Sequence, residues 1–425
     1  MRLLTSIVYI IKKCFYREQD NRYAAQILFA AGKPEFARHI GYLAYNLTVN
    51  LSYGVLPVIY FDNAATSFPK PLSVKKALDE AVMRAGNPGR GSHSAAMWSA
   101  TEIYRTRECL ADLFNIADPL RIAFTLNATH ALNIAVNLCK GEIITTSMEH
   151  NSVLRPCHQR GFYRVIYADM DGDIEPRKIV RAISSVTGAV IMTHASNVTG
   201  NIYDIGAVGA ECRKRGVLFV VDASQTAGAV DIDVESMNID VLCFAGHKGL
   251  YGIQGTGGLY VAPNVPIRPY MSGGSGNRSF ELRQPDEMPE CFEAGTVNTH
   301  GIVSLGAGVR YIKNIGVTEI YNHEKMLRDY FIERVSKLDN ITVYGGRKGK
   351  YVGVVSISIR NIDCSEVSAY LASRGICVRS GIHCAPLAHN TIGTGENGTV
   401  RFSFGYNNTK KEIDFAFDVL KRLQR

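Results

Sequence analysis

Lys248 stands in a glycine-flanked turn, Gly246-His247-Lys248-Gly249, directly after the apolar run Asp240–Ala245. A lysine placed after a strand in this way can direct its amine into a cleft. Burial or nearby cations there lower the pKa of the amine and make it a nucleophile toward aldehydes. Taken alone, such a lysine is more often a solvated loop residue. The chemical interpretation therefore needs a second residue that serves the same aldehyde cofactor.

Asp222 is that second residue, because it ends the apolar run Val217–Asp222, one predicted strand earlier in the chain. Pyridoxal 5'-phosphate (PLP) needs a carboxylate against its pyridine nitrogen, which keeps that nitrogen protonated and lets the ring act as an electron sink. Asp222 could also be the N-cap of a following helix, and both roles can hold together. A strand-end aspartate combined with a strand-end lysine predicts a PLP site.

Three further segments carry groups that a PLP site uses. Asn127-Ala128-Thr129 lies between a predicted strand and a helix expected at Ala131–Leu138, so its backbone N–H groups could hold a phosphate. His150 follows another predicted strand and could stack on the cofactor ring, although a lone histidine there is more often structural. Asn197 offers an amide to the phenolic oxygen of the cofactor or to a substrate. Each signal is weak alone, and the prediction depends on their order along the chain.

Seven β-rich runs separated by helix-like segments would position these residues. The runs are Arg121–Leu126, Glu142–Thr146, Arg164–Tyr167, Ala189–His194, Val217–Asp222, Asp240–Ala245 and Gly257–Val261. Such alternation predicts an α/β fold around a largely parallel sheet with both faces buried. Ligands of these sheets collect at the carboxyl ends of the strands, which is where the candidate residues fall.

The pattern changes after about residue 300. An amphipathic stretch (Val303–Asn314, then Gly316–Lys337) precedes short strands near 341–344, 354–359, 378–379 and 400–404, with helices at 364–374 and 410–423. We interpret this part as a smaller α+β domain. The expected organisation is a leader of uncertain status at 1–57, a large PLP-binding domain at 58–302 and a small C-terminal domain at 303–425.

Composition narrows the classes of function. Apolar residues make up 46% of the 425 residues and charged residues 20%, as in an ordinary globular protein. The net charge of +8 comes without a basic run that carries interleaved aromatics, which argues against a nucleic-acid surface. The 10 cysteines include no CxxC pair, which argues against a zinc site and a disulfide framework and fits a reducing cytoplasm.

The leader shows neither a membrane anchor nor an export signal. Its run Leu3–Ile11 is too short to span a bilayer, and Lys12 and Lys13 follow where a signal peptide would need small residues and a cleavage site. Two interpretations of residues 1–57 stay open: an N-terminal helical arm, or sequence upstream of a natural start near Val58. We favour the second, because the chemistry-bearing sequence begins sharply at Val58.

Seven ordered motifs resemble those of class V aminotransferase-fold PLP enzymes. They are Phe61-Asp62-Asn63-Ala64-Ala65-Thr66, Met148-Glu149-His150-Asn151, Ser196-Asn197-Val198-Thr199-Gly200, Val221-Asp222-Ala223-Ser224-Gln225, Gly246-His247-Lys248, Phe292-Glu293-Ala294-Gly295-Thr296 and Arg379-Ser380-Gly381-Ile382-His383-Cys384-Ala385-Pro386. Within that fold the chain is similar to the group II (Suf-type) cysteine desulfurases, a subgroup that includes selenocysteine lyases. The resemblance covers essentially all of residues 58–425 and implies a fold type I PLP enzyme that works as a homodimer.

The resemblance implies a role for individual residues. Lys248 would form the Schiff base with PLP and act as general acid and base, and His150 would stack on the ring as a further catalytic residue. The other implied cofactor contacts are Asp222 at the pyridine nitrogen, Gln225 at the phenolic oxygen, Asn197 at the ring or substrate, Ala128, Thr129 and His247 at the phosphate, and Thr296 reaching the site of the second subunit. Arg401 would clamp the substrate α-carboxylate through two hydrogen bonds, and Arg379 and His93 would line the substrate pocket.

Cys384 decides the subclass. A sulfur acceptor must be a thiolate on a loop near the substrate sulfur, and Arg379 and His383 could lower the pKa of its thiol. Without the resemblance, a cysteine here would more often be a small buried hydrophobic residue. With it, the expected function is a PLP-dependent cysteine desulfurase that converts L-cysteine to L-alanine and leaves a persulfide on Cys384 for an acceptor protein.

Departures from the family pattern keep alternatives open. Ala128 and Ala245 stand where the family has hydroxyl side chains, His130 stands where it has glutamate, and Gly249 is an extra residue after the lysine. Two lost hydroxyls would weaken phosphate binding unless backbone amides compensate. The alternatives are a selenocysteine lyase acting on L-selenocysteine, another class V aminotransferase or β-lyase in which Cys384 is incidental, and a sulfur-relay partner with weak turnover.

Overall fold

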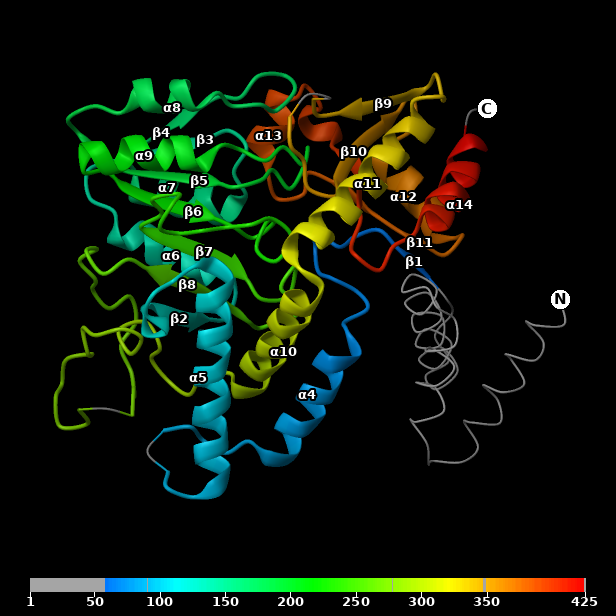
Figure 1. The fold of residues 1–425 in the computed structure, drawn as a ribbon. Helices are drawn as coiled ribbons and strands as arrows, with labels where there is room; N and C mark the ends of the chain where they lie inside the picture. Colours follow the sequence, from blue (N-terminus) through cyan, green and yellow to red (C-terminus); the bar gives the residue numbers. More distant parts are fainter. Residues whose placement is uncertain (1–57, 90, 277, 347–348, 424–425) are drawn as a thin grey trace, which may run out of the picture. The chain divides into compact units, whose positions relative to one another are not determined.

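The structure, a computed structural model, describes residues 58–89, 91–276, 278–346 and 349–423. The expectation for residues 1–57 lies outside the described residues. Within the described ranges, helices and strands follow one another from β1 (Ile59–Tyr60) to α14 (Lys410–Lys421) (Figure 1).

A seven-stranded sheet runs through the first part of the described chain. Its strands are β2 (Ile122–Thr125), β3 (Glu142–Thr146), β4 (Tyr163–Ile166), β5 (Thr187–Thr193), β6 (Leu218–Asp222), β7 (Val241–Ala245) and β8 (Gly257–Val261), in the order β2-β8-β7-β6-β5-β3-β4. β8 runs antiparallel to both its neighbours, and the other paired strands are parallel. The predicted α/β fold with a mainly parallel seven-stranded sheet is confirmed.

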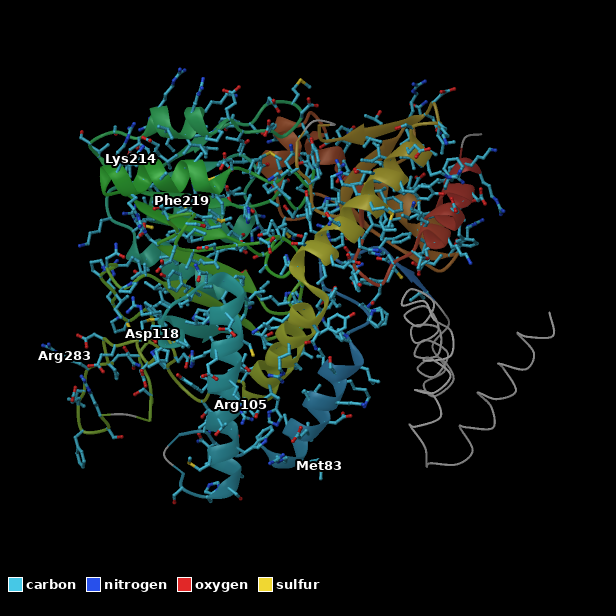
Figure 2. All side chains as sticks on the ribbon, viewed as in Figure 1. Met83, Arg105, Asp118, Lys214, Phe219 and Arg283 are labelled. Atoms are coloured by element: carbon cyan, nitrogen blue, oxygen red, sulfur yellow. The ribbon has the colours of Figure 1, made fainter. Side chains whose placement is uncertain are left out.

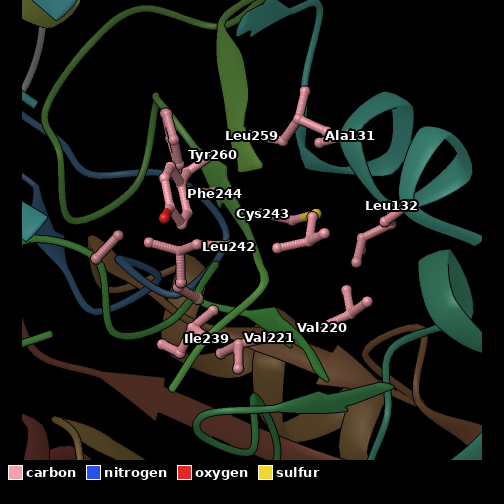
Figure 3. Close-up of a cluster of buried hydrophobic side chains, with 14 of the residues drawn as sticks. Ala131, Leu132, Val220, Val221, Ile239, Leu242, Cys243, Phe244, Leu259 and Tyr260 are labelled. Atoms are coloured by element: carbon pink, nitrogen blue, oxygen red, sulfur yellow. The ribbon is translucent and has the colours of Figure 1, made fainter. Parts of the chain in front are cut away.

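The central strands β6, β7 and β8 are mainly apolar because helices cover the sheet, whereas the edge strand β4 has the exposed Arg164. All five residues of β7 are buried. Figure 3 shows part of this core, in which side chains from three strands gather with two from a helix: Val220, Leu242, Phe244, Leu259, Ala131 and Leu132. The helix is α6 (Ala128–Leu138), which packs against β7 and β8.

Other helices are held to the same core. They are α4 (Leu72–Arg84), α5 (Ser94–Phe114), α7 (Asn151–Arg160), α8 (Pro176–Ala182), α9 (Ile205–Arg215) and α10 (Thr299–Ile315). α9 lies close to β6 because Gly209 has no side chain; a Cβ there would come within 3.0 Å of the Phe219 ring. Figure 2 shows Phe219 below α9 in this view and Lys214 at the C-terminal end of that helix. α10 packs against α4 and α5 (Figure 1).

A second, antiparallel sheet follows later in the chain, with the order β12-β13-β10-β9. Its strands are β9 (Ile341–Tyr344), β10 (Val354–Ile359), β12 (Arg379–Gly381) and β13 (Thr399–Ser403). α11 (Val317–Val335), α12 (Cys364–Ala372) and α14 contribute to its separate apolar core. This is the α+β arrangement expected for the C-terminal part.

The first described strand belongs to this second region. β1 pairs in parallel with β11 (Ile376–Cys377), and Phe61 lies in the second apolar core. Residues 59–425 form one compact unit, in which α10 lies in the first core and α11 enters the second. The proposed boundary between residues 302 and 303 stays a prediction. None of the helices within the described ranges is both long and apolar enough to cross a membrane.

Candidate active site

A polar cavity of about 210 Å³ lies at the carboxyl ends of the parallel strands. Both sheets contribute to its wall. The predicted residues that line it are Ala128, Thr129, His150, Asn197, Asp222, Gln225, His247, Lys248, Arg379 and Arg401. Ten residues chosen from separate motifs thus meet around one cavity. Three predicted residues are not part of the described lining: His93, Thr296 and Cys384.

Lys248 is half-buried, and its side chain borders the cavity. Burial lowers the pKa of Lys248 to about 8; the nearby Arg401 and Arg379 lower it further, and Asp222 opposes them. The turn that contains Lys248 is stabilised by a segment that precedes the sheet in the sequence. Ser67 Oγ donates a hydrogen bond to the Lys248 carbonyl at 2.9 Å. The result is an amine that can lose its proton near neutral pH.

Asp222 occupies the last position of β6 and is 4% exposed. Its Oδ1 accepts hydrogen bonds from the backbone N–H of Ser224 at 2.9 Å and from the Ser224 hydroxyl at 2.5 Å. These bonds hold the carboxylate in place while it borders the cavity. The two roles weighed for Asp222, a local cap and a cofactor contact, are therefore compatible.

His150 is the N-cap of α7, and its Nδ1 accepts a hydrogen bond from the backbone N–H of Ser152 at 3.0 Å. Burial, reinforced by the charge of Lys248, lowers the pKa of His150 to about 4. The imidazole is therefore neutral at pH 7, and its proton is on Nε2. A neutral ring held at the cavity wall suits stacking on an aromatic cofactor.

Ser152 is a cavity residue that the sequence analysis missed. It lies two positions beyond His150, and its hydroxyl is 2.9 Å from His150 Nδ1 and 2.7 Å from Thr129 Oγ1. The signal was present in Met148-Glu149-His150-Asn151, which a hydroxyl residue follows. Ser152 and Thr129 supply hydroxyl groups close to the position where Ala128 lacks one.

One end of the cavity is built by the first turn of α6, which begins at Ala128, three residues before the expected start. Asn127 is its N-cap and accepts a hydrogen bond from the backbone N–H of His130 at 2.9 Å. Gly257 of β8 allows a close approach here, since a Cβ would lie 2.6 Å from the Asn127 carbonyl carbon. The helix N-terminus and adjacent hydroxyls form a cradle for an anion.

Arg401 of β13 is 1% exposed. Its Nη1 donates a hydrogen bond to the Asn197 carbonyl at 3.1 Å, and its Nη2 donates to Asp62 Oδ1 at 2.9 Å. Its Nε is buried and has no hydrogen-bond partner within the described part of the chain. A buried donor without a partner calls for an explanation, and a carboxylate in the cavity would provide one. Asp62, which the sequence analysis did not select, orients this guanidinium.

The cavity therefore contains groups that fit PLP: an amine of lowered pKa, a strand-end carboxylate, a neutral imidazole and an anion cradle. Burial also lowers the pKa of His247, to about 4, and its Nδ1 lies 3.1 Å from Thr66 Oγ1. Gln225 donates from its side-chain amide to the Ala64 carbonyl at 3.2 Å. These contacts show how His247 and Gln225 are held at the cavity, and the cofactor contacts expected of them stay predictions.

Cys384 is exposed and follows His383, which does line the cavity. His383 and Cys384 both have left-handed backbone conformations, with φ values of 53° and 57°. Such conformations are uncommon for residues other than glycine. The turn is held by Asn151, whose backbone N–H donates to the Cys384 carbonyl at 2.7 Å, and by Asn197, whose amide donates to the His383 carbonyl at 2.8 Å.

Arg379 and His383 were both expected to act on the Cys384 thiol, and this stays a prediction. Burial and nearby Arg401 lower the pKa of His383 to about 2. His383 is therefore neutral at pH 7, and Arg379 is the cation of the two.

His93 and Thr296 lie in other surroundings. His93 is the N-cap of α5, where its Nδ1 accepts a hydrogen bond from the backbone N–H of Ala96 at 3.3 Å. Thr296 is exposed. Neither borders the cavity of its own chain within the described residues, so their predicted contacts with substrate and with a second subunit stay predictions.

Comparison with known proteins identifies the family. Residues 59–415 match the family described as aminotransferase class-V. The chain belongs to this family. A probable cysteine desulfurase from Methanothermobacter thermautotrophicus is 34% identical over 380 residues, covering 86% of this chain and 94% of that protein. The cysteine desulfurase IscS from Vibrio campbellii is 33% identical over 388 residues, covering 85% and 92%.

Solved structures agree with the curated relatives. The apo structure of a cysteine desulfurase from Thermococcus onnurineus NA1 has a TM-score of 0.81 and 33% identity, and covers 86% of this chain and 94% of its own. The cysteine desulfurase CsdA from Escherichia coli has a TM-score of 0.77 at 25% identity, covering 86% and 94%. At the level of the class V family and its cysteine desulfurases, the prediction from sequence is confirmed.

Proposed function

We propose that this chain is a PLP-dependent cysteine desulfurase in which Cys384 accepts the sulfur of L-cysteine and L-alanine is released. The observation that carries the proposal is the meeting of Lys248, Asp222 and Arg401 in one cavity whose wall continues directly into the Cys384 turn. The curated relatives, named as cysteine desulfurases, support the same reaction.

The cofactor contacts follow from the charges in the cavity. PLP bound there would supply an aromatic ring that withdraws electrons from the substrate α-carbon. Asp222 would keep the pyridine nitrogen protonated, and the first turn of α6, with Thr129 and Ser152, would hold the phosphate. Because its pKa is lowered to about 8, the Lys248 amine can accept and return a proton near neutral pH.

Arg401 would bind the substrate carboxylate. Its guanidinium is fixed by Asp62 and by the Asn197 carbonyl, while Nε has no protein partner among the described residues. A planar guanidinium held on one side is prepared for hydrogen bonds on the other. This contact would orient the amino acid so that its sulfur faces the Cys384 turn.

Cys384 would then attack the substrate sulfur as a thiolate. The sulfur bond to the substrate β-carbon breaks, a persulfide remains on Cys384, and the carbon skeleton takes up protons and leaves as alanine. Because Cys384 is exposed, an acceptor protein could reach the persulfide. The chain's own residues therefore cover substrate binding, proton transfer and sulfur acceptance.

We further propose that the chain belongs to the group II (Suf-type) desulfurases and works as a cytoplasmic homodimer. The segment Arg379-Ser380-Gly381-Ile382-His383-Cys384 supports the subgroup. Exposed Thr296, which does not border the described cavity of its own chain, supports a contact with the partner's cofactor. The nine cysteines of the described residues are free thiols, which supports a reducing compartment.

The reaction is tested by loading the protein with PLP and supplying L-cysteine with a thiol reductant. Alanine and sulfide should form in equal amounts. Pyruvate and ammonia in place of alanine would indicate a β-lyase, and amino-group transfer that needs a keto acid would indicate an aminotransferase. Much faster turnover of L-selenocysteine would assign a selenocysteine lyase, and turnover that accelerates sharply with an acceptor protein would indicate a relay subunit.

A further inference from the structure

Two buried histidines form a contact directly behind the Cys384 turn. His383 is 4% exposed and His389, on α13 (Pro386–Thr391), is 0% exposed. Their rings are stacked with centroids 5.5 Å apart, and His383 Nδ1 lies 3.3 Å from His389 Nε2. His389 does not border the cavity, and the proposed reaction does not use it.

The partners of the pair determine which nitrogen carries each proton. His383 Nε2 lies 3.1 Å from the Arg379 carbonyl, which can only accept, so His383 donates there. In a neutral His383, Nδ1 is then an acceptor, and His389 must donate to it from Nε2. His389 Nδ1 is left to accept from the Thr394 hydroxyl at 2.7 Å, which is nearer to it than to its other acceptor, the His389 carbonyl at 3.2 Å. One direction of donation therefore runs from Thr394 through both histidines to Arg379.

Both histidines are neutral, as this chain of hydrogen bonds requires. Burial lowers the pKa of His389 to about 4, with Arg401 adding to the effect. Burial also dominates the lowering of the His383 pKa, and the charges of Arg401 and Arg379 and the neighbouring His389 act in the same direction, while the hydrogen bond to the Arg379 carbonyl opposes them. At neutral pH the two histidines are therefore uncharged, and the hydrogen bonds between them keep one direction.

The chain of hydrogen bonds spans the base of the strained turn. It begins at Thr394, after α13, and ends at the carbonyl of Arg379, the first residue of β12. Between these points lie the left-handed residues His383 and Cys384. Strained backbone conformations of this kind persist only where contacts with the surrounding structure stabilise them. His389 provides such a contact, because its side chain hydrogen-bonds to the side chain of His383.

We propose that His389 is a positioning residue for sulfur transfer: its Nε2–H holds His383 against the Arg379 carbonyl and thereby fixes the turn that presents Cys384 to the substrate. The sulfur-transfer part rests on the proposed function. The positioning part concerns the turn alone and can be tested without turnover.

Two amide substitutions of His389 separate the proposal from a general packing role. Gln can place its amide nitrogen near the position of Nε2, whereas Asn is too short to reach His383. His389→Gln should therefore keep most of the activity. His389→Asn should lower kcat by about 10- to 100-fold, the scale expected when a reacting group is displaced by about 1 Å. The KM for cysteine should change little, because the Arg401 contacts are intact.

Hydrogen exchange measured by mass spectrometry tests the turn independently of the reaction. The backbone N–H groups of Asn151 and Ala385, which donate to the carbonyls of Cys384 and Ile382, should exchange about tenfold faster in His389→Asn than in the wild type. His389→Gln should resemble the wild type. Thr394→Val, which removes the hydroxyl that donates to His389 Nδ1, should give a smaller change in the same direction and serves if His389→Asn does not fold.

Unchanged exchange in both His389→Asn and Thr394→Val would overturn the proposal, as would equal loss of activity in the Gln and Asn variants. A wild-type protein without desulfurase activity, combined with the expected exchange pattern, would refute the proposed function and leave the positioning role standing. The expected exchange with a normal kcat in His389→Asn would instead refute the link to sulfur transfer.

Discussion

The side-chain amide of Asn197 donates a hydrogen bond to the His383 carbonyl, 2.8 Å away. The main-chain carbonyl of Asn197 accepts another from Arg401 Nη1 at 3.1 Å. One residue after a strand of the first sheet therefore holds both the turn of Cys384 and the guanidinium proposed to bind the substrate. In the proposed reaction, the same residue would therefore set the position of the sulfur acceptor and the position of the substrate.

Asn197→Asp should uncouple them. The substitution replaces a buried donor with an acceptor that faces the His383 carbonyl, so the bond is lost and two oxygens oppose each other. We expect kcat for desulfuration to fall by about tenfold or more. Asn340→Asp is the matched control, because Asn340 also donates to a main-chain carbonyl, that of Leu423, but away from the cavity. Equal rates in the two variants would show that Asn197 has no such role.

The pH dependence of PLP capture tests the environment of Lys248. Only the neutral amine attacks the aldehyde, and burial lowers the pKa of Lys248 to about 8. The rate at which the apoprotein binds PLP covalently should rise with pH, reach half its maximum near pH 8, and then level off. An ordinary exposed lysine, with a pKa of about 10.4, would give a rate that still rises at pH 9–10. Stopped-flow absorbance measures the rate, and Lys248→Ala should show no covalent capture.

Arg401→Lys should weaken cysteine binding because lysine cannot reproduce two parallel hydrogen bonds. Loss of one hydrogen bond to a charged group costs about 1.5–3 kcal/mol, so kcat/KM should fall by about 10- to 150-fold. Arg107→Lys controls for the loss of a buried arginine, since Arg107 pairs with Glu293 away from the cavity. A similar loss in both variants would indicate damage to the fold rather than to substrate binding.

Ser152→Ala should reduce the retention of PLP. Its hydroxyl lies beside Thr129 at the start of α6, where the proposed phosphate site has alanine at positions 128 and 245. Removing one hydrogen bond to an anion should weaken PLP binding by about tenfold, measured by dialysis and fluorescence. The exposed Ser236→Ala provides the control. If retention is unchanged in Ser152→Ala, backbone amides alone hold the phosphate.

The sheet could be predicted because its strands are short, rich in β-branched and apolar residues, and mostly separated by helical segments. Glu142–Thr146 and Gly257–Val261 were predicted with the bounds that the structure gives them. Asp222 and Lys248 could be selected because each follows such a run directly. In these strands the local sequence and the tertiary packing favour the same structure, an extended strand.

Other features depend on contacts between distant segments. α13 was missed because it has six residues and no full amphipathic pattern. Asp62, Ser152 and His389 gain their importance from Arg401, Thr129 and His383, and their spacing in the sequence does not reveal these partners. The neutral state of His383 could not be predicted for a related reason, since burial cannot be judged from a histidine beside a cysteine.

The central claim is that Cys384 accepts sulfur, and intact-mass analysis tests it most directly. The PLP-loaded protein should gain about one sulfur atom when incubated with L-cysteine without reductant, and alanine should appear. Cys384→Ala should lose both the added mass and the alanine, whereas Cys364→Ala, which changes another partly accessible thiol, should retain them. Alanine production that continues in Cys384→Ala, without added sulfur on the wild-type protein, would contradict the account.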